Sequence, residues 1–131
     1  MALKKFIGNL NRLLNESTTN ERTLYPIICN FLQEIGLEFK FQNVFATSEE
    51  SLESTEKKIG FPDITIRQGN RLIGWIEVKL PKDSLNSSHF SEQFKKYQES
   101  LENVLFTNLR EWQLWGWDED GKPKKIAEEL F

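Results

Sequence analysis

Cysteine and histidine are nearly absent from this sequence, whose 131 residues include one of each, Cys29 and His89. A single cysteine forms neither an internal disulfide nor a cysteine-based zinc site, and this usage predicts a cytoplasmic protein. We expect Cys29 to be a core residue on the apolar side of a helix. His89 lies in a polar stretch, where a solvated or capping role is expected rather than general base catalysis.

Long apolar runs and an excess of basic charge are also missing. No run approaches the roughly 20 residues that cross a bilayer, so we expect no membrane contact. The formal net charge of −3 argues against a free-standing domain that holds nucleic acid through a basic surface. A chain of this length folds as one compact unit, so we expect a single domain over residues 1–131.

Apolar residues recur at helical spacing in two N-terminal segments. They are Leu3, Phe6, Ile7, Leu10, Leu13 and Leu14 in the first segment, and Leu24, Ile27, Ile28, Phe31, Leu32 and Ile35 in the second. The second pattern predicts a helix that ends at Gly36. Thr18 and Glu21 have the spacing of a capping box, which would place Pro26 inside the helix. A kink at Pro26, or a start near Thr23, is the alternative.

The rest of the chain predicts mainly strands. Alternation predicts a strand over residues 37–41, and composition predicts an exposed loop over residues 47–58. Residues 61–67 and 72–79 predict a hairpin around Gly69–Asn70. Residues 90–105 follow helical spacing, although the last few also fit a strand. Two closing strands are predicted over residues 104–107 and 112–117. A short helix is predicted over residues 124–131. This order predicts an α/β fold with a central mixed sheet flanked by helices.

Three polar residues stand out in the otherwise apolar hairpin: Asp63, Glu77 and Lys79. Side chains alternate across a strand, so Glu77 and Lys79 project from the same face. A two-residue turn places Asp63 opposite Ile76, and a three-residue turn places it opposite Glu77. Cross-strand neighbours have Cβ atoms about 4.5 to 5.5 Å apart, so either turn lets the two carboxylates converge on one small cation.

Two carboxylates this close repel each other unless a cation or a proton separates them. Mg²⁺ prefers one or two carboxylates together with water and substrate phosphate oxygens. Lys79, next along the same face, is placed to orient or activate an attacking water, and the set therefore suits phosphodiester hydrolysis. The non-functional alternative is a hairpin edge on which Lys79 forms a surface ion pair with an acidic neighbour. Such a pair stabilises the folded state by only about 0 to 1 kcal/mol.

The chain carries Pro62-Asp63, then Glu77 fourteen residues further on, and then Val78-Lys79. In this spacing it resembles the PD-(D/E)xK nuclease superfamily. The resemblance implies a restriction-endonuclease-like core and a metal ligand at the main-chain carbonyl of Val78. Glu21 matches the acidic residue that many members carry on the helix before the sheet, where it assists metal or water binding. Gln93 and Tyr97 look like the Gln-x-x-x-Tyr element of a subset, in which the glutamine positions the substrate or the lysine.

Residues 103–108 and 111–115 are similar to the closing strands of Mrr-like nuclease domains at the N-terminus of type ISP and single-chain type IIG restriction-modification enzymes. This likeness implies an N-terminal fragment of a larger polypeptide whose methyltransferase, translocase and target-recognition domains supply DNA affinity and sequence choice. Mg²⁺ is the expected cofactor, with Mn²⁺ as a substitute, and double-stranded DNA is the expected substrate. Lys95, Lys96 and Tyr97 are the expected DNA contacts, and double-strand cleavage by such a domain implies a transient dimer.

Two alternatives to a restriction-type endonuclease stay open. A structure-selective nuclease of the repair or resolvase kind would share the metal site but would normally carry its own basic DNA surface. A catalytically inactive nuclease-like fold could instead serve as a docking or regulatory module. The presence of Asp63, Glu77 and Lys79 together argues against this last alternative.

Overall fold

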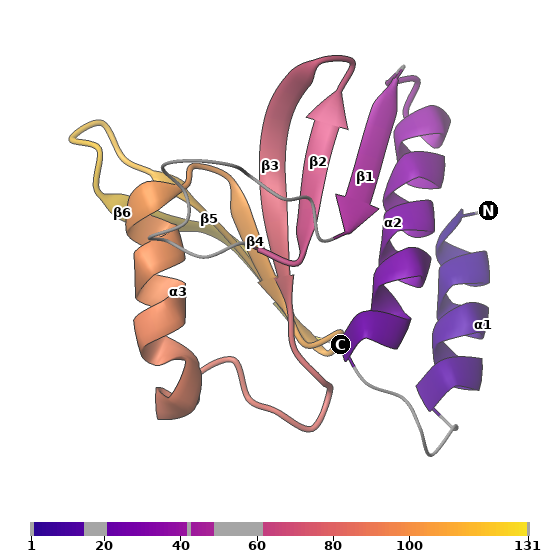
Figure 1. Ribbon diagram of the computed structural model, residues 1–131, viewed down its shortest axis with the longest axis horizontal. Helices are drawn as coiled ribbons and strands as arrows, with labels where there is room; N and C mark the ends of the chain where they lie inside the picture. The colour runs from indigo at the N-terminus through magenta and orange to yellow at the C-terminus, as the bar shows by residue number, and fades with distance from the viewer. Residues whose placement is uncertain (1, 15–20, 42, 49–61, 131) are drawn as a thin grey trace.

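The computed structural model describes residues 2–14, 21–41, 43–48 and 62–130 (Figure 1). In chain order the elements are α1 (Ala2–Leu14), α2 (Glu21–Glu38), β1 (Val44–Ser48), β2 (Ile64–Gln68), β3 (Arg71–Val78), α3 (Ser88–Ser100), β4 (Val104–Thr107), β5 (Glu111–Trp117) and β6 (Pro123–Leu130). The described elements therefore form an α/β fold.

The six strands form one sheet in the order β1-β2-β3-β4-β5-β6. Neighbouring strands are antiparallel except β3 and β4, which are parallel. Parallel neighbours need a crossover, and α3 supplies it. The predicted fold class, a central mixed sheet flanked by helices, is confirmed, and the arrangement is consistent with a restriction-endonuclease-like core.

The helices cover opposite faces of the sheet, with α1 and α2 on one side and α3 on the other (Figure 1). One apolar cluster joins α1 and α2 to the sheet through residues such as Leu24, Ile28 and Ile76, and it includes the buried Cys29 that the sequence predicts. A second cluster joins α3 to the opposite face through residues such as Tyr97 and Phe106. The sheet is thus buried on both faces where it passes between the helices, which explains why its central strands are apolar.

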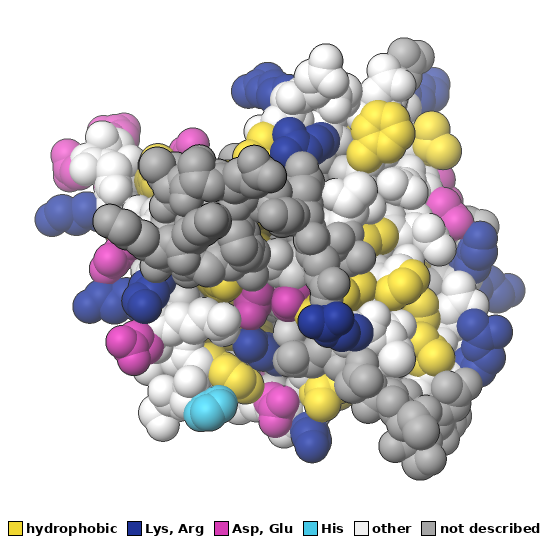
Figure 2. Space-filling model, viewed as in Figure 1, with side chains coloured by type: hydrophobic (Ala, Val, Ile, Leu, Met, Phe, Trp, Pro, Cys, Tyr) yellow, Lys and Arg dark blue, Asp and Glu magenta, His cyan; other side chains and the backbone are white. Residues whose placement is uncertain are grey.

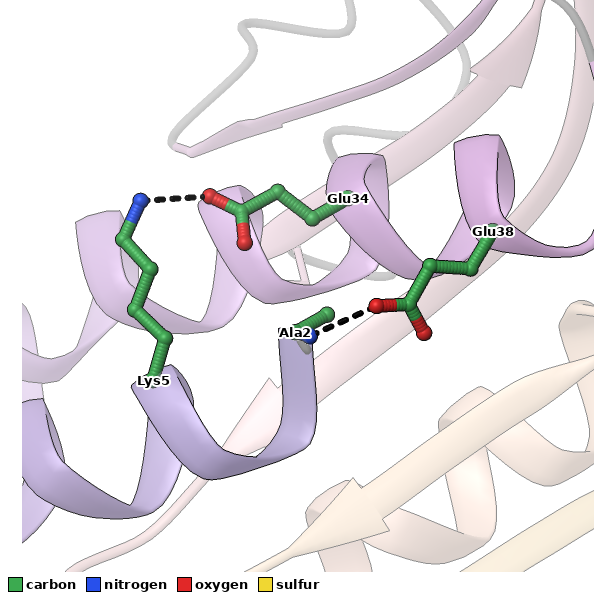
Figure 3. A network of polar contacts seen from close by, with 4 residues as sticks. All are labelled: Ala2, Lys5, Glu34 and Glu38. Atoms are coloured by element: carbon green, nitrogen blue, oxygen red, sulfur yellow. Dashed lines mark hydrogen bonds and ion pairs between the residues drawn. The ribbon is translucent and has the colours of Figure 1, made fainter.

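Polar contacts fix α1 against α2 at their solvent-facing side (Figure 3). The Lys5 ammonium lies 2.8 Å from the Glu34 carboxylate, and the backbone N–H of Ala2 donates to Glu38 Oε1 at 2.7 Å. The second bond satisfies one of the N–H groups that the first turn of a helix leaves without an intrahelical partner. α2 runs from Glu21 with Pro26 inside it, so the alternative start near Thr23 is wrong, while Thr18 of the expected capping box lies outside the described residues.

The predicted strand over residues 37–41 is wrong, because α2 continues to Glu38. The helix ends at Glu38, Lys40 just beyond it adopts a left-handed conformation with φ 63°, and Gly36 stays inside the helix. The N–H of Lys40 donates to Leu37 O at 3.0 Å and that of Phe41 to Gly36 O at 2.8 Å, the bonding pattern of a Schellman motif. The first strand is β1, which contains Thr47; residues 49–58 of the predicted loop lie outside the described residues.

The predicted helix at residues 124–131 is also wrong, because Pro123–Leu130 forms β6. A turn at Gly121, with φ 76° and a bond from its N–H to Asp118 O at 3.0 Å, returns the chain alongside β5. Pairing with β5 then overrides the helical preference of the local sequence. The third helix ends at Ser100, so the last residues of the 90–105 segment belong to β4, as the strand alternative expects, and the two closing strands match their predicted positions.

Candidate functional site

The candidate site is built on the β2–β3 hairpin, whose turn is the two-residue Gly69–Asn70 with Gln68 opposite Arg71. The register shifts one step further along, because Arg67 pairs with Leu72 whereas Ile66 pairs with Gly74. Ile73 is therefore an extra residue on β3, which is a β-bulge. Beyond the bulge Ile64 faces Ile76, so the next residues along, Asp63 and Glu77, face each other. A two-residue turn followed by a bulge therefore places Asp63 opposite Glu77. The sequence predicts this pairing from a three-residue turn.

Alternation along β3 separates the polar side chains from the main core. Ile76 and Val78 belong to the cluster under α1 and α2. Glu77 pairs with Phe106 of the α3 cluster and so projects toward α3, as does Lys79. Glu77 is only 3% exposed and Lys79 9% exposed. Charged groups are rarely buried to this degree unless they are paired, so this end of β3 is unlike an ordinary solvated hairpin edge.

Short contacts connect the three predicted residues. The backbone N–H of Val78 donates to Asp63 Oδ2 at 2.7 Å, which fixes this carboxylate at the end of β3. Lys79 Nζ lies 3.2 Å from Glu77 Oε2. The structure therefore brings Asp63, Glu77 and Lys79 together, as the alternation and the turn predict.

Two residues of α3 hold the Lys79 ammonium from its other sides. Lys79 Nζ donates to Gln93 Oε1 at 3.2 Å. The same nitrogen lies 4.6 Å from the centre of the Phe90 ring, a cation–π contact. The sequence indicated Gln93 but not Phe90: the spacing of three residues puts Phe90 on the same helix face as Gln93, yet it does not indicate a contact with Lys79.

The second oxygen of Glu77 has no ordinary partner. Glu77 Oε1 is buried and accepts no hydrogen bond from any residue that the structure describes. Burial, followed by the negative charge of Asp63, raises the pKa of Glu77 from 4.5 to about 8, while Lys79 opposes that rise. The pair is thus arranged to share a proton or a cation.

The donor set fits a hard divalent cation such as Mg²⁺. It offers a buried carboxylate oxygen without a partner and a second carboxylate directly across the hairpin. Among the described residues no three or more His, Cys, Asp or Glu side chains converge on one point. Mg²⁺ is commonly held by one or two carboxylates with water completing its coordination, so a third acidic ligand is not required.

Tyr97 lies beneath the same site. It is 1% exposed, and burial, then the charges of Glu77 and Asp63, raise the pKa of its phenol, while a hydrogen bond with Gln93 opposes the rise. A side chain so buried offers no surface to a nucleic acid, so the expected DNA contact at Tyr97 is corrected to a core position under the carboxylates.

The remaining predicted site residues are placed less closely. Glu21 is the first residue of α2, but its side chain lies outside the described part of the chain, so its metal or water role stays a prediction. Lys95 and Lys96 are both exposed on α3. Figure 2 shows both basic and acidic side chains on one face of the molecule. The described helices include none that is both long enough and apolar enough to cross a bilayer.

Comparison with known proteins finds one informative likeness. Neither a protein-family model nor a curated protein sequence matches the chain. A chain in the cryo-EM structure of a DrdV–DNA complex superimposes with a TM-score of 0.71 at 18% sequence identity. The match covers 98% of the present chain and 12% of the DrdV chain. The two chains therefore share a fold over essentially the whole length of this one.

Proposed function

We propose that this chain is a Mg²⁺-dependent DNA endonuclease domain that hydrolyses phosphodiester bonds. The observation that carries the proposal is the pair formed by the half-buried Asp63 and the buried Glu77, which face each other beside the Lys79 ammonium. The fold shared with a chain solved in complex with DNA supports DNA as the substrate. The specific activity rests on the chemistry of the three side chains.

Asp63 and Glu77 would hold the metal, with the main-chain carbonyl of Val78 as a third protein oxygen. The bond from the Val78 N–H to Asp63 supports this set, because it ties the aspartate to the backbone of the residue whose carbonyl is proposed as a ligand. A bound Mg²⁺ would lower the pKa of a coordinated water and offset the negative charge that develops on the phosphoryl oxygens.

Lys79 would orient the attacking water and stabilise the pentacovalent phosphorus with its positive charge. Its contacts with Glu77, Gln93 and Phe90 hold the ammonium in one place, which reduces the ordering needed before reaction. Gln93 is therefore a positioning residue in this proposal.

We further propose that the chain is the cleavage module of a longer restriction-modification polypeptide. The chain corresponds to 12% of the DrdV chain, and its own net charge is −3. Methyltransferase, translocase and target-recognition domains would then supply most of the DNA affinity, while Lys95 and Lys96 contact phosphates near the cleaved bond.

The test combines metal binding with cleavage. Calorimetric titration with Mn²⁺ should show binding to the 131-residue chain that Asp63→Asn and Glu77→Gln each abolish. Nicking or linearisation of supercoiled plasmid at high protein concentration should be lost in these two variants and in Lys79→Met.

Glu92→Gln and Lys82→Met are the matched controls, because both residues are exposed and lie outside the site. They should leave metal binding and cleavage unchanged. Wild-type cleavage in all three site variants would refute the proposal. Metal binding without cleavage, when the chain is tested inside its parent polypeptide, would favour an inactive docking module.

A further inference from the structure

The two edge strands of the sheet differ in how far other elements cover them. At the β1 edge, α2 packs alongside, and Gln33 Oε1 accepts the backbone N–H of Ala46 at 3.1 Å. At the other edge, β6 pairs only with β5 among the described strands. Every residue of β6 from Lys124 to Leu130 is exposed. An uncovered strand edge presents unpaired N–H and C=O groups that can pair with another chain.

The charges along β6 are ordered by sign. The strand reads Lys124-Lys125-Ile126-Ala127-Glu128-Glu129, with two basic residues, two apolar residues and then two acidic residues. When this segment runs antiparallel to a second copy of itself, each lysine meets a glutamate. The pairs are Lys125 with Glu128 and Lys124 with Glu129, formed twice by symmetry. Opposite charges across neighbouring strands stabilise pairing, and like charges oppose it.

Residues that face each other on neighbouring strands project from the same side of the sheet. In a regular strand Lys125 and Glu128 would project from opposite faces, because they lie an odd number of positions apart, and this alignment would fail. β6 is not regular: Trp115 pairs with Lys125 whereas Leu114 pairs with Ala127, so Ile126 is an extra residue in a β-bulge. The bulge is anchored where the Ile126 side chain lies directly over Gly116.

The bulge places the charges on matching faces. Lys125 and Glu128 share the α3 face, since they form an ion pair at 2.7 Å and Lys125 lies 5.9 Å from the Trp115 ring centre. Glu129 lines an apolar groove on the α1 side, and Lys124 projects to that side by alternation. Within each lysine–glutamate pair across the two copies, the lysine and the glutamate therefore project from the same face of the sheet, which is the α3 face for Lys125 with Glu128 and the α1 side for Lys124 with Glu129.

We propose that β6 is a self-association surface at which a second copy of this chain pairs antiparallel, about a two-fold axis near Ile126 and Ala127. Alignments centred on Lys125 or on Glu128 place identical charges opposite each other and are disfavoured. Charged edge residues generally prevent edge pairing, but here the order of the charges favours a second copy of the chain in this register.

The symmetry of this pairing sets the positions of the two candidate sites. A two-fold axis perpendicular to a continuous sheet keeps both α3 helices, and thus both sets of Asp63, Glu77 and Lys79, on the same side. The self-association does not depend on the nuclease proposal, but it would present two such sites to one duplex. A single strand edge buries little area, so the dimer is weak and forms mainly when copies are concentrated.

Charge reversal tests the surface directly. The double variants K124E/K125E and E128K/E129K each make the edge uniformly charged. Analytical ultracentrifugation up to millimolar protein should show self-association of the wild type that is at least about tenfold weaker in either variant. An equimolar mixture of the two variants should associate at least as strongly as the wild type, because every cross-strand charge pair is restored.

The double variant K4E/K82E is the control, since it makes the same charge change on exposed residues that lie outside β6 and are not proposed to bind DNA. It should associate like the wild type. Absence of association in both the wild type and the mixture would overturn the proposal. Dimerisation that persists in both edge variants would also overturn it and would point to another surface, such as the apolar groove between α1 and β5. Recovery in the mixture shows that both variants are folded.

Discussion

At the scale of single residues, the most unusual feature is a glutamate buried against an aspartate. Glu77 has one oxygen bonded to Lys79 and one with no partner among the described residues. Leaving a buried polar atom unsatisfied costs stability, roughly 1 to 3 kcal/mol. Such a cost is typical of a site arranged for a ligand or a proton rather than for stability.

The raised pKa of Glu77 predicts a specific pH dependence in the absence of metal. The folded protein keeps the Glu77 proton up to a pKa of about 8, whereas the unfolded chain releases it near the ordinary value of 4.5. The folded state thus binds more protons between these values, so the free energy of unfolding should fall as pH rises from about 5 to 8. The loss due to Glu77 is on the order of a few kcal/mol.

Urea denaturation in EDTA at several pH values between 5 and 8 measures this effect. The Glu77→Gln variant, which cannot ionise at this position, should lose less stability over the interval and should exceed the wild type in stability at pH 8. The exposed Glu92→Gln should follow the wild-type curve. Parallel curves for wild type and Glu77→Gln would contradict the assignment of a shared proton.

At the scale of elements, the bulge in β3 decides which residue faces Asp63. Its neighbour Gly74 lies so close to β4 that an added Cβ would stand 2.8 Å from the backbone oxygen of Asn103. The backbone N–H of Trp75 donates to the same oxygen at 3.2 Å. Only glycine permits this approach, so Gly74 supports both the parallel β3–β4 pairing and the register that aligns the carboxylates.

Two glycine-to-alanine substitutions should therefore have opposite effects. Gly74→Ala pushes β3 away from the Asn103 oxygen and should lower the free energy of unfolding by about 1 to 3 kcal/mol. Gly8→Ala lies inside α1, where an added Cβ meets nothing within 4 Å, and should raise it by about 0.5 to 1 kcal/mol. Chemical denaturation of both variants measures the difference, and equal effects would show that the close approach at Gly74 is not limiting.

At the scale of the whole molecule, acidic residues outnumber basic ones. The net charge is −3, and basic and acidic side chains are mixed on the face in Figure 2. Affinity for duplex DNA depends mainly on basic residues that neutralise phosphates. The proposal that other domains supply most of the DNA affinity is based on this net charge.

We accordingly predict weak DNA binding by the 131-residue chain alone. Fluorescence anisotropy with a labelled duplex at physiological salt should give a dissociation constant of roughly 10⁻⁴ M or weaker, without sequence preference. At low salt K95E/K96E should weaken binding further. Tight binding, with a dissociation constant below about 1 μM, would show that the chain carries its own DNA surface.

Much of the site could be predicted from local sequence. Alternation places Glu77 and Lys79 on one face regardless of the surroundings, and the hairpin turn brings Asp63 within reach of them. Gln93 was expected only because Gln93 and Tyr97 look like a Gln-x-x-x-Tyr element, and spacing alone does not indicate its contact with Lys79. The contact between Phe90 and Lys79 could not be predicted in this way, because it depends on how α3 packs against the sheet.

The sequence by itself determined the α/β class and the juxtaposition of two carboxylates and a lysine, since periodicity and turn chemistry act over a few residues. Tertiary structure alone decided three further features. It turned residues 123–130 into a strand, set the exact partner of Asp63 through a bulge, and buried Glu77 so that one oxygen has no described partner. Each depends on strand pairing or burial between segments far apart in the chain, which no local pattern specifies.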